Sequence, residues 1–270
     1  MAITIDASEQ AAFSQDRLSG TSRTNVIDRW IYVFTAASLI AIVFAGFIPD
    51  SFMKVAAIGA GQRAPFPPIL HVHAVLMGSF LLLLLAQTVL VATDRRTWHM
   101  QLGVAAMVLA PAIVISGFIL VPTIYHSVWN AAQIAPAPVR LQLQGVLPIL
   151  DDILLLQLRA GFLFSICMWI ALRSRIKDSG VHKRLIFLAI ATALPAALDR
   201  IQWLPTTMPN HPIGTDLYSI LAFSPMFVWD LIRNRGVHRA YWIFAAFFLP
   251  VTAVVMRSGI SLGGTPRHAT

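Results

Sequence analysis

The residues best suited to chemistry are histidines and aspartates that interrupt long apolar segments. His71 and His73 open one such segment, Asp151 and Asp152 open another, and Asp199 lies late in a third. Polar groups are costly inside a membrane, so each needs a partner or a function. An imidazole can bind a metal or haem or relay a proton, and a carboxylate can act as a catalytic acid or base.

Helical geometry limits how the histidines can combine. Two residues correspond to about 200° of rotation, so His71 and His73 face opposite ways. His73 begins a stripe at helical spacing that we expect to face the bundle interior: His73, Met77, Phe80, Leu84 and Gln87. His73 is therefore a candidate cofactor ligand or proton relay. The alternative is that both histidines sit at the headgroup level and bind water or carbonyls.

His99 and His182 are further candidate cofactor ligands. Both lie beside Arg or Lys near the ends of apolar segments. A role in capping and interface anchoring accounts for them equally well. No metal site is predicted, and the single cysteine, Cys167, excludes an intramolecular disulfide.

A buried ion pair is the sharpest structural prediction. Asp152 and Arg159 are seven residues apart and share one helix face. Asp199 lies late in its own segment, at a similar expected depth. Because an unpaired charge in a membrane is costly, we predict that Arg159 pairs with Asp152, Asp199 or both. The two aspartates are also the candidate catalytic residues, and a purely structural ion pair is the alternative.

Other polar residues are expected in outer loops or at helix starts. They could complete a site with His73, or they could be ordinary loop residues; they are His126, Asn210, His211, Asp216 and Tyr218.

The elements that must position these residues are transmembrane helices. Of the 270 residues, 57% are hydrophobic and 12% are charged, against about 25% charged in a soluble domain. Seven segments are long and apolar enough to span a membrane, and they are Trp30–Ile48, Ile69–Thr93, Leu102–Val121, Pro148–Leu172, Leu185–Leu204, Leu217–Ile232 and Ala240–Met256. The sixth is the weakest because it is short and contains Pro225. The sequence thus predicts an all-α polytopic bundle over residues 29–257, with polar tails at 1–28 and 258–270.

The basic residues predict the orientation of this bundle. Thirteen Lys and Arg residues fall on the side of the N-terminus and five on the other side. By the positive-inside rule the N-terminus is cytoplasmic, and seven spans then place the C-terminus outside. The net charge of +8 therefore indicates topology rather than nucleic-acid binding. The expected partners are the lipid bilayer of the inner (plasma) membrane and other membrane subunits.

Two resemblances add to this interpretation. The pattern Leu70-His71-Val72-His73-Ala74, Gln87, His99-Met100-Gln101-Leu102-Gly103 and His182-Lys183-Arg184 resembles a family of bacterial multi-pass membrane proteins without assigned function, over about residues 28–205. The chain is more loosely similar to di-haem b-type transmembrane cytochromes. That similarity implies His73 as an outer haem ligand and His99 or His182 as an inner one.

Three functions remain open from the sequence. The first is a membrane redox protein that binds haem or quinone at an outer-half polar site. The second is a membrane enzyme that acts on a lipid or isoprenoid through Asp151, Asp152 or Asp199. The third is a transporter or accessory subunit without catalysis.

Overall fold

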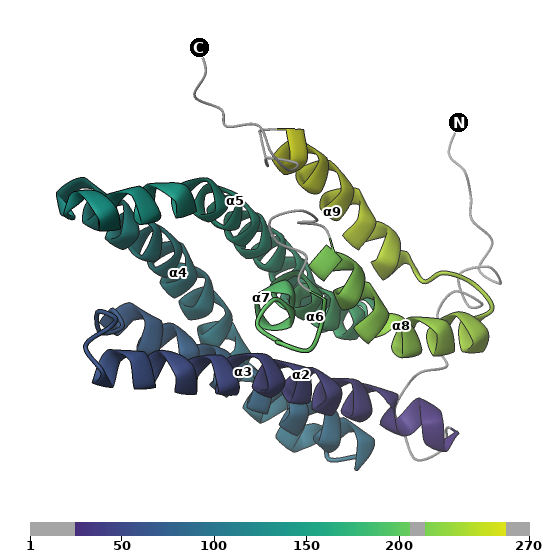
Figure 1. The fold of residues 1–270 in the computed structure, drawn as a ribbon. Helices are drawn as coiled ribbons and strands as arrows, with labels where there is room; N and C mark the ends of the chain where they lie inside the picture. The colour runs from purple at the N-terminus through teal and green to yellow at the C-terminus, as the bar shows by residue number, and fades with distance from the viewer. Residues whose placement is uncertain (1–24, 206–213, 258–270) are drawn as a thin grey trace.

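The structure is a computed structural model that describes residues 25–205 and 214–257. Helices are the regular elements of this described part of the chain (Figure 1). They are α2 (Val26–Gly59), α3 (Pro68–Ala92), α4 (Arg96–Ile134), α5 (Ala137–Ser174), α6 (Ser179–Ala193), α7 (Pro195–Leu198), α8 (Gly214–Asn234) and α9 (Arg239–Arg257). The predicted tails lie outside the described residues, apart from 25–28.

The helices begin where the sequence offers caps or prolines. The side chain of Asn25 accepts a hydrogen bond from the backbone of Ile27 at the start of α2, and Asp178 accepts one from Val181 at the start of α6. Proline opens α3 at Pro68 and α7 at Pro195, because the N–H that proline lacks has no partner in the first turn of a helix. The predicted fifth span is therefore two consecutive helices.

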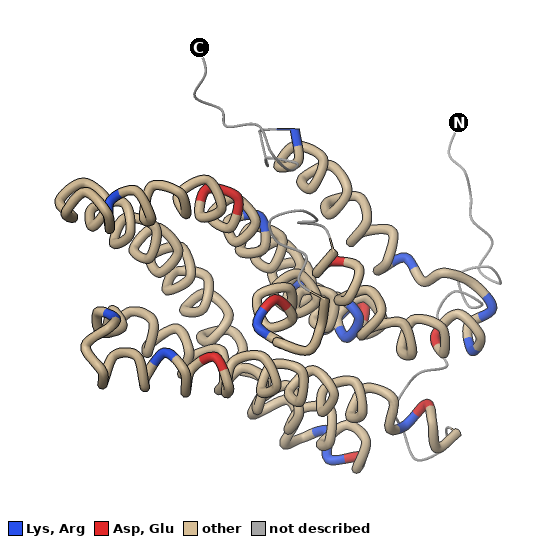
Figure 2. Tube along the Cα trace, in the orientation of Figure 1, with Lys and Arg blue, Asp and Glu red and all other residues tan. Residues whose placement is uncertain are grey.

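Six segments are long and apolar enough to cross a membrane, namely α2, α3, α4, α5, α9 and the combined α6–α7 segment. Figure 2 shows α3, α4 and α9 with long stretches that carry no charged residue. The predicted fold class is confirmed: the chain is a multi-pass helical membrane protein.

The sixth predicted span, Leu217–Ile232, corresponds to α8, which continues through Pro225. Its 21 residues extend about 31 Å, close to the thickness of a bilayer core. However, α8 buries Asp216 and Asp230 on its inward face. With these charged residues α8 falls outside the six apolar segments. That α8 crosses the membrane therefore remains a prediction.

Helix α6 occupies the centre of the bundle (Figure 1), and nine of its fifteen residues are buried. The core around it includes Leu39 of α2, Phe80 of α3, Phe164 of α5 and Met226 of α8. The backbones of α2 and α7 approach each other closely. A Cβ atom at Gly46 would lie 2.1 Å from the carbonyl oxygen of Ala197, so only glycine fits there.

The two ends of the bundle are named here by the predicted orientation. The inner end carries the turn between α3 and α4. The outer end carries the α2–α3 and α4–α5 turns, which lie at the same side of the bundle in Figure 1.

Candidate functional site

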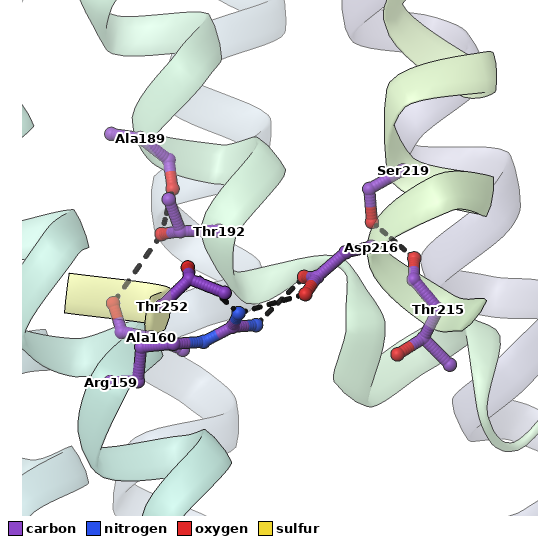
Figure 3. Close-up of polar contacts among 8 residues, drawn as sticks. All are labelled: Arg159, Ala160, Ala189, Thr192, Thr215, Asp216, Ser219 and Thr252. Atoms are coloured by element: carbon purple, nitrogen blue, oxygen red, sulfur yellow. Dashed lines mark hydrogen bonds and ion pairs between the residues drawn. The ribbon is translucent and has the colours of Figure 1, made fainter. Parts of the chain in front are cut away.

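A buried ion pair joins α5 to α8 in the outer half of the bundle. The guanidinium of Arg159 donates hydrogen bonds of 2.8 and 2.7 Å to the two carboxylate oxygens of Asp216, and a third of 3.1 Å to the hydroxyl of Thr252 on α9 (Figure 3). Both charged residues are 4% exposed. The face of Phe248 lies 5.6 Å from the guanidinium carbon. Arg159 therefore ties three helices together.

This geometry corrects the predicted partners of Arg159. Among the described residues, its bidentate partner is Asp216, rather than Asp152 or Asp199. Sequence spacing favours Asp152 because it shares a helix with Arg159, yet the first turn of α8 brings Asp216 to the guanidinium. The sequence places Asp216 among the residues of outer loops and helix starts, and nothing in its local sequence distinguishes it as the partner of Arg159.

The two candidate catalytic aspartates occupy different settings. Asp152 is buried on α5, with 2% of its surface exposed. Asp199 is the exposed C-cap residue of α7 and lies beside Thr215 and Tyr218 of α8.

A second buried ion pair joins α6 to α8 in the inner half. Arg184 donates hydrogen bonds of 2.5 and 2.6 Å to the carboxylate of Asp230, and the two residues are 0% and 1% exposed. Sequence reasoning missed this pair because Arg184 counts naturally among the topology-setting charges beside His182 and Lys183. Asp230 was the available signal, since an acidic residue within an apolar segment needs a cation.

A third carboxylate, Asp28, is fully buried at the inner end of α2. It accepts hydrogen bonds from Arg233 at 2.7 Å and from the indole of Trp229 at 2.8 Å, both on α8. Helix α8 is therefore held by charge pairs to α5, α6 and α2. The three aspartates that take part, Asp28, Asp216 and Asp230, serve packing in this structure.

His73 lies at the outer α3–α4 interface. Its Nδ1 is 2.9 Å from the hydroxyl oxygen of Ser116, and that hydroxyl donates to the carbonyl of Ile113 at 3.0 Å. Because the serine proton is used in this way, the Nδ1 of His73 carries the hydrogen and donates, which leaves the lone pair on Nε2. A Cβ at Gly117 would lie 3.3 Å from the His73 ring, so glycine permits this approach.

The predicted orientation of this helix face is confirmed. Phe80 and Leu84 are buried, Met77 packs against the core, and the amide atoms of Gln87 are buried. His71 is exposed, with its ring edge against Phe66.

The inner end brings together three residues of the sequence pattern. His99 of α4 hydrogen-bonds to the backbone of Gln87 on α3, and His182 of α6 lies near enough to His99 to be affected by its charge. We call Gln87, His99 and His182 the inner polar cluster. The Nδ1 of His182 donates to the carbonyl of Ala171 at 2.8 Å, which again leaves the lone pair on Nε2.

The inner polar cluster contains unsatisfied polar atoms. Both amide atoms of Gln87 and the Nδ1 of His99 are buried, and among the described residues none of the three has a hydrogen-bond partner. Gly103 of α4 lies beside this amide, and a Cβ there would make an ordinary contact of 3.5 Å with the amide nitrogen. Buried polar groups are normally paired, so this cluster can accept a ligand that offers hydrogen bonds.

The histidines form two sites rather than one. Fourteen residues of helix, about 21 Å, separate His73 from Gln87 along α3. His73 therefore cannot share a ligand with His99 and His182. Asn210 and His211, two of the outer polar residues considered above, lie outside the described residues, and His126 is exposed on α4.

In the described part of the chain, no group of three or more His, Cys, Asp or Glu side chains is arranged to hold a metal ion. A pair of imidazoles, as in haem ligation, is a different arrangement. Comparisons with known protein families, with curated proteins and with solved structures find no match for this chain.

Proposed function

We propose that the protein is a membrane redox protein that binds haem or a quinone through histidines at the interfaces of α3, α4 and α6. The observation that carries this proposal is the hydrogen bonding of Nδ1 in His73 and His182. Histidines that ligate metals almost always donate their second N–H in this way, which fixes the ring and increases the basicity of the ligating nitrogen.

The inner polar cluster supports both cofactor classes. For haem, His99 and His182 supply imidazoles from two different helices, as axial ligation requires. For a quinone, the unpaired amide of Gln87 and the Nδ1 of His99 supply hydrogen bonds to a carbonyl oxygen. His73 would then serve a separate outer site. Electron donors and acceptors would be other components of the same plasma membrane.

The carboxylate chemistry of a lipid-modifying enzyme has less support. Asp216, Asp230 and Asp28 are each bound to an arginine. A carboxylate held by a guanidinium is a poor proton acceptor, because the cation stabilises its charged form.

The test is an absorption spectrum of the detergent-purified protein, oxidised and reduced, with iron analysis and mass spectrometry of an organic extract. We expect a haem Soret band or a stoichiometric quinone. His99→Ala and His182→Ala should each remove the inner cofactor, whereas the matched control His71→Ala, on the exposed face of α3, should retain it. Absence of both cofactors, even after incubation with haem and with quinone, would refute the proposal.

A further inference from the structure

A groove of about 440 Å³ lies between α3 and α4 at the inner end. Its walls are apolar, and Arg95 stands at the turn that closes it; the lining residues are Ala86, Val89, Leu90, Arg95, Trp98 and Leu102. Trp98 is 65% exposed and Leu102 is 41% exposed. Since α3 and α4 are both membrane-spanning candidates, the groove opens toward lipid.

The charge of Arg95 is not neutralised by the described part of the protein. Its side chain is exposed and makes no hydrogen bond or ion pair with a described residue. Two other arginines, Arg96 and Arg29, do have partners. Arg96 lies 3.6 Å from the carboxylate of Asp94, and Arg29 donates a hydrogen bond to the carbonyl of Ala92. An apolar groove thus ends at an uncompensated guanidinium.

We propose that this groove binds one acyl chain of an anionic phospholipid, whose phosphate is held by Arg95. Lipid tails surround α3 and α4, so a chain can enter from the side. Arg95 lies just beyond the end of α3, at the level where headgroups begin, and exposed tryptophans such as Trp98 favour that level. A guanidinium binds phosphate oxygens bidentately, and a headgroup with net negative charge complements it better than a zwitterionic one.

Native mass spectrometry of the full-length protein tests the charge. The protein is incubated with equimolar phosphatidylglycerol and phosphatidylcholine of identical chains, and the retained lipid is identified by mass. Wild type should prefer phosphatidylglycerol, and Arg95→Gln should weaken that preference about fivefold. Arg96→Gln, which removes the same charge one residue away, should leave it unchanged. Equal retention of the two lipids by wild type, or equal effects of both substitutions, would overturn the proposal.

A second pair of variants tests the groove itself. Ala86→Phe fills the groove and should reduce retention of phosphatidylglycerol, whereas Ala74→Phe places the same ring on an exposed position of α3 outside it and should not. If a quinone, rather than a phospholipid, is the molecule displaced by Ala86→Phe, the lipid assignment is wrong. That result would leave the cofactor proposal standing, so the two fail separately.

Discussion

Arg184 and Asp230 form a bidentate ion pair that is closed off from solvent and lipid, with hydrogen bonds of 2.5 and 2.6 Å and exposures of 0% and 1%. It joins the central helix α6 to α8, the least apolar of the long helices. Together with Arg159–Asp216 near the other end of α8, it attaches this helix at two points fourteen residues apart. That spacing, about 21 Å of helix, explains how a helix with two aspartates on its inner face is retained in the bundle.

Breaking this pair should destabilise the protein strongly. Asp230→Asn leaves the guanidinium of Arg184 buried without a counter-charge, which costs roughly 3–5 kcal/mol. Denaturant titration of the detergent-solubilised protein, followed by circular dichroism, measures the loss. Arg239→Gln is the control: it disrupts a pair with Asp178 whose arginine is 65% exposed, and such pairs contribute about 0–1 kcal/mol. Similar losses for the two variants would contradict the assignment of a buried charge pair.

The double variant Arg184→Met/Asp230→Leu should recover much of that stability. Removing both charges leaves no unpaired ion, and apolar replacements of buried pairs are often neutral or stabilising. The recovery, measured as a coupling energy in the double-mutant cycle, isolates the interaction. Additive losses would show that the two side chains act independently.

A crossing α8 should place the α8–α9 turn on the cytoplasmic side. The variant Gly236→Cys introduces a cysteine into that turn, where a Cβ meets nothing within 4 Å. The variant Ala64→Cys introduces one into the α2–α3 turn, which is predicted to lie outside. The native Cys167 is buried and should not react. A membrane-impermeant maleimide applied to intact cells should label Ala64→Cys alone, and both variants after permeabilisation. Labelling of Gly236→Cys in intact cells would mean that α8 does not cross.

Gly46→Ala should destabilise the contact between α2 and α7. The added methyl group would meet the Ala197 carbonyl at 2.1 Å, and relief of such overpacking costs about 1–3 kcal/mol. Gly78→Ala, on α3, adds the same group where nothing lies within 4 Å, so it should leave the melting temperature unchanged or slightly raised. Equal melting temperatures for the two variants would argue against the close approach.

Ser116→Ala should weaken a cofactor bound by His73, because it removes the acceptor that fixes the imidazole ring. Loss of such a hydrogen bond typically reduces affinity about 10–100-fold. Ser127→Ala is the matched control, since Ser127 lies on the same helix and its hydroxyl donates to the Ile124 carbonyl, as that of Ser116 does to Ile113. Titration of each variant with the cofactor, followed by absorbance, measures the two affinities. Unchanged affinity in Ser116→Ala would remove His73 from the ligand set.

Local sequence pattern predicted the helices, because a membrane span is a property of consecutive apolar residues. It also predicted which way His71 and His73 face, since rotation along a helix depends only on residue spacing. The demand that Arg159 find a carboxylate followed from the cost of an unpaired charge in lipid. Each of these inferences needs no knowledge of neighbouring helices.

The tertiary structure alone decided which partners meet. Asp216 reaches Arg159 across 57 residues, Asp230 reaches Arg184 across 46, and Asp28 reaches Arg233 across 205. The same packing brings Gln87, His99 and His182 together from three helices. Sequence spacing cannot supply these contacts, because it specifies the face of a helix but not the helix that packs against that face.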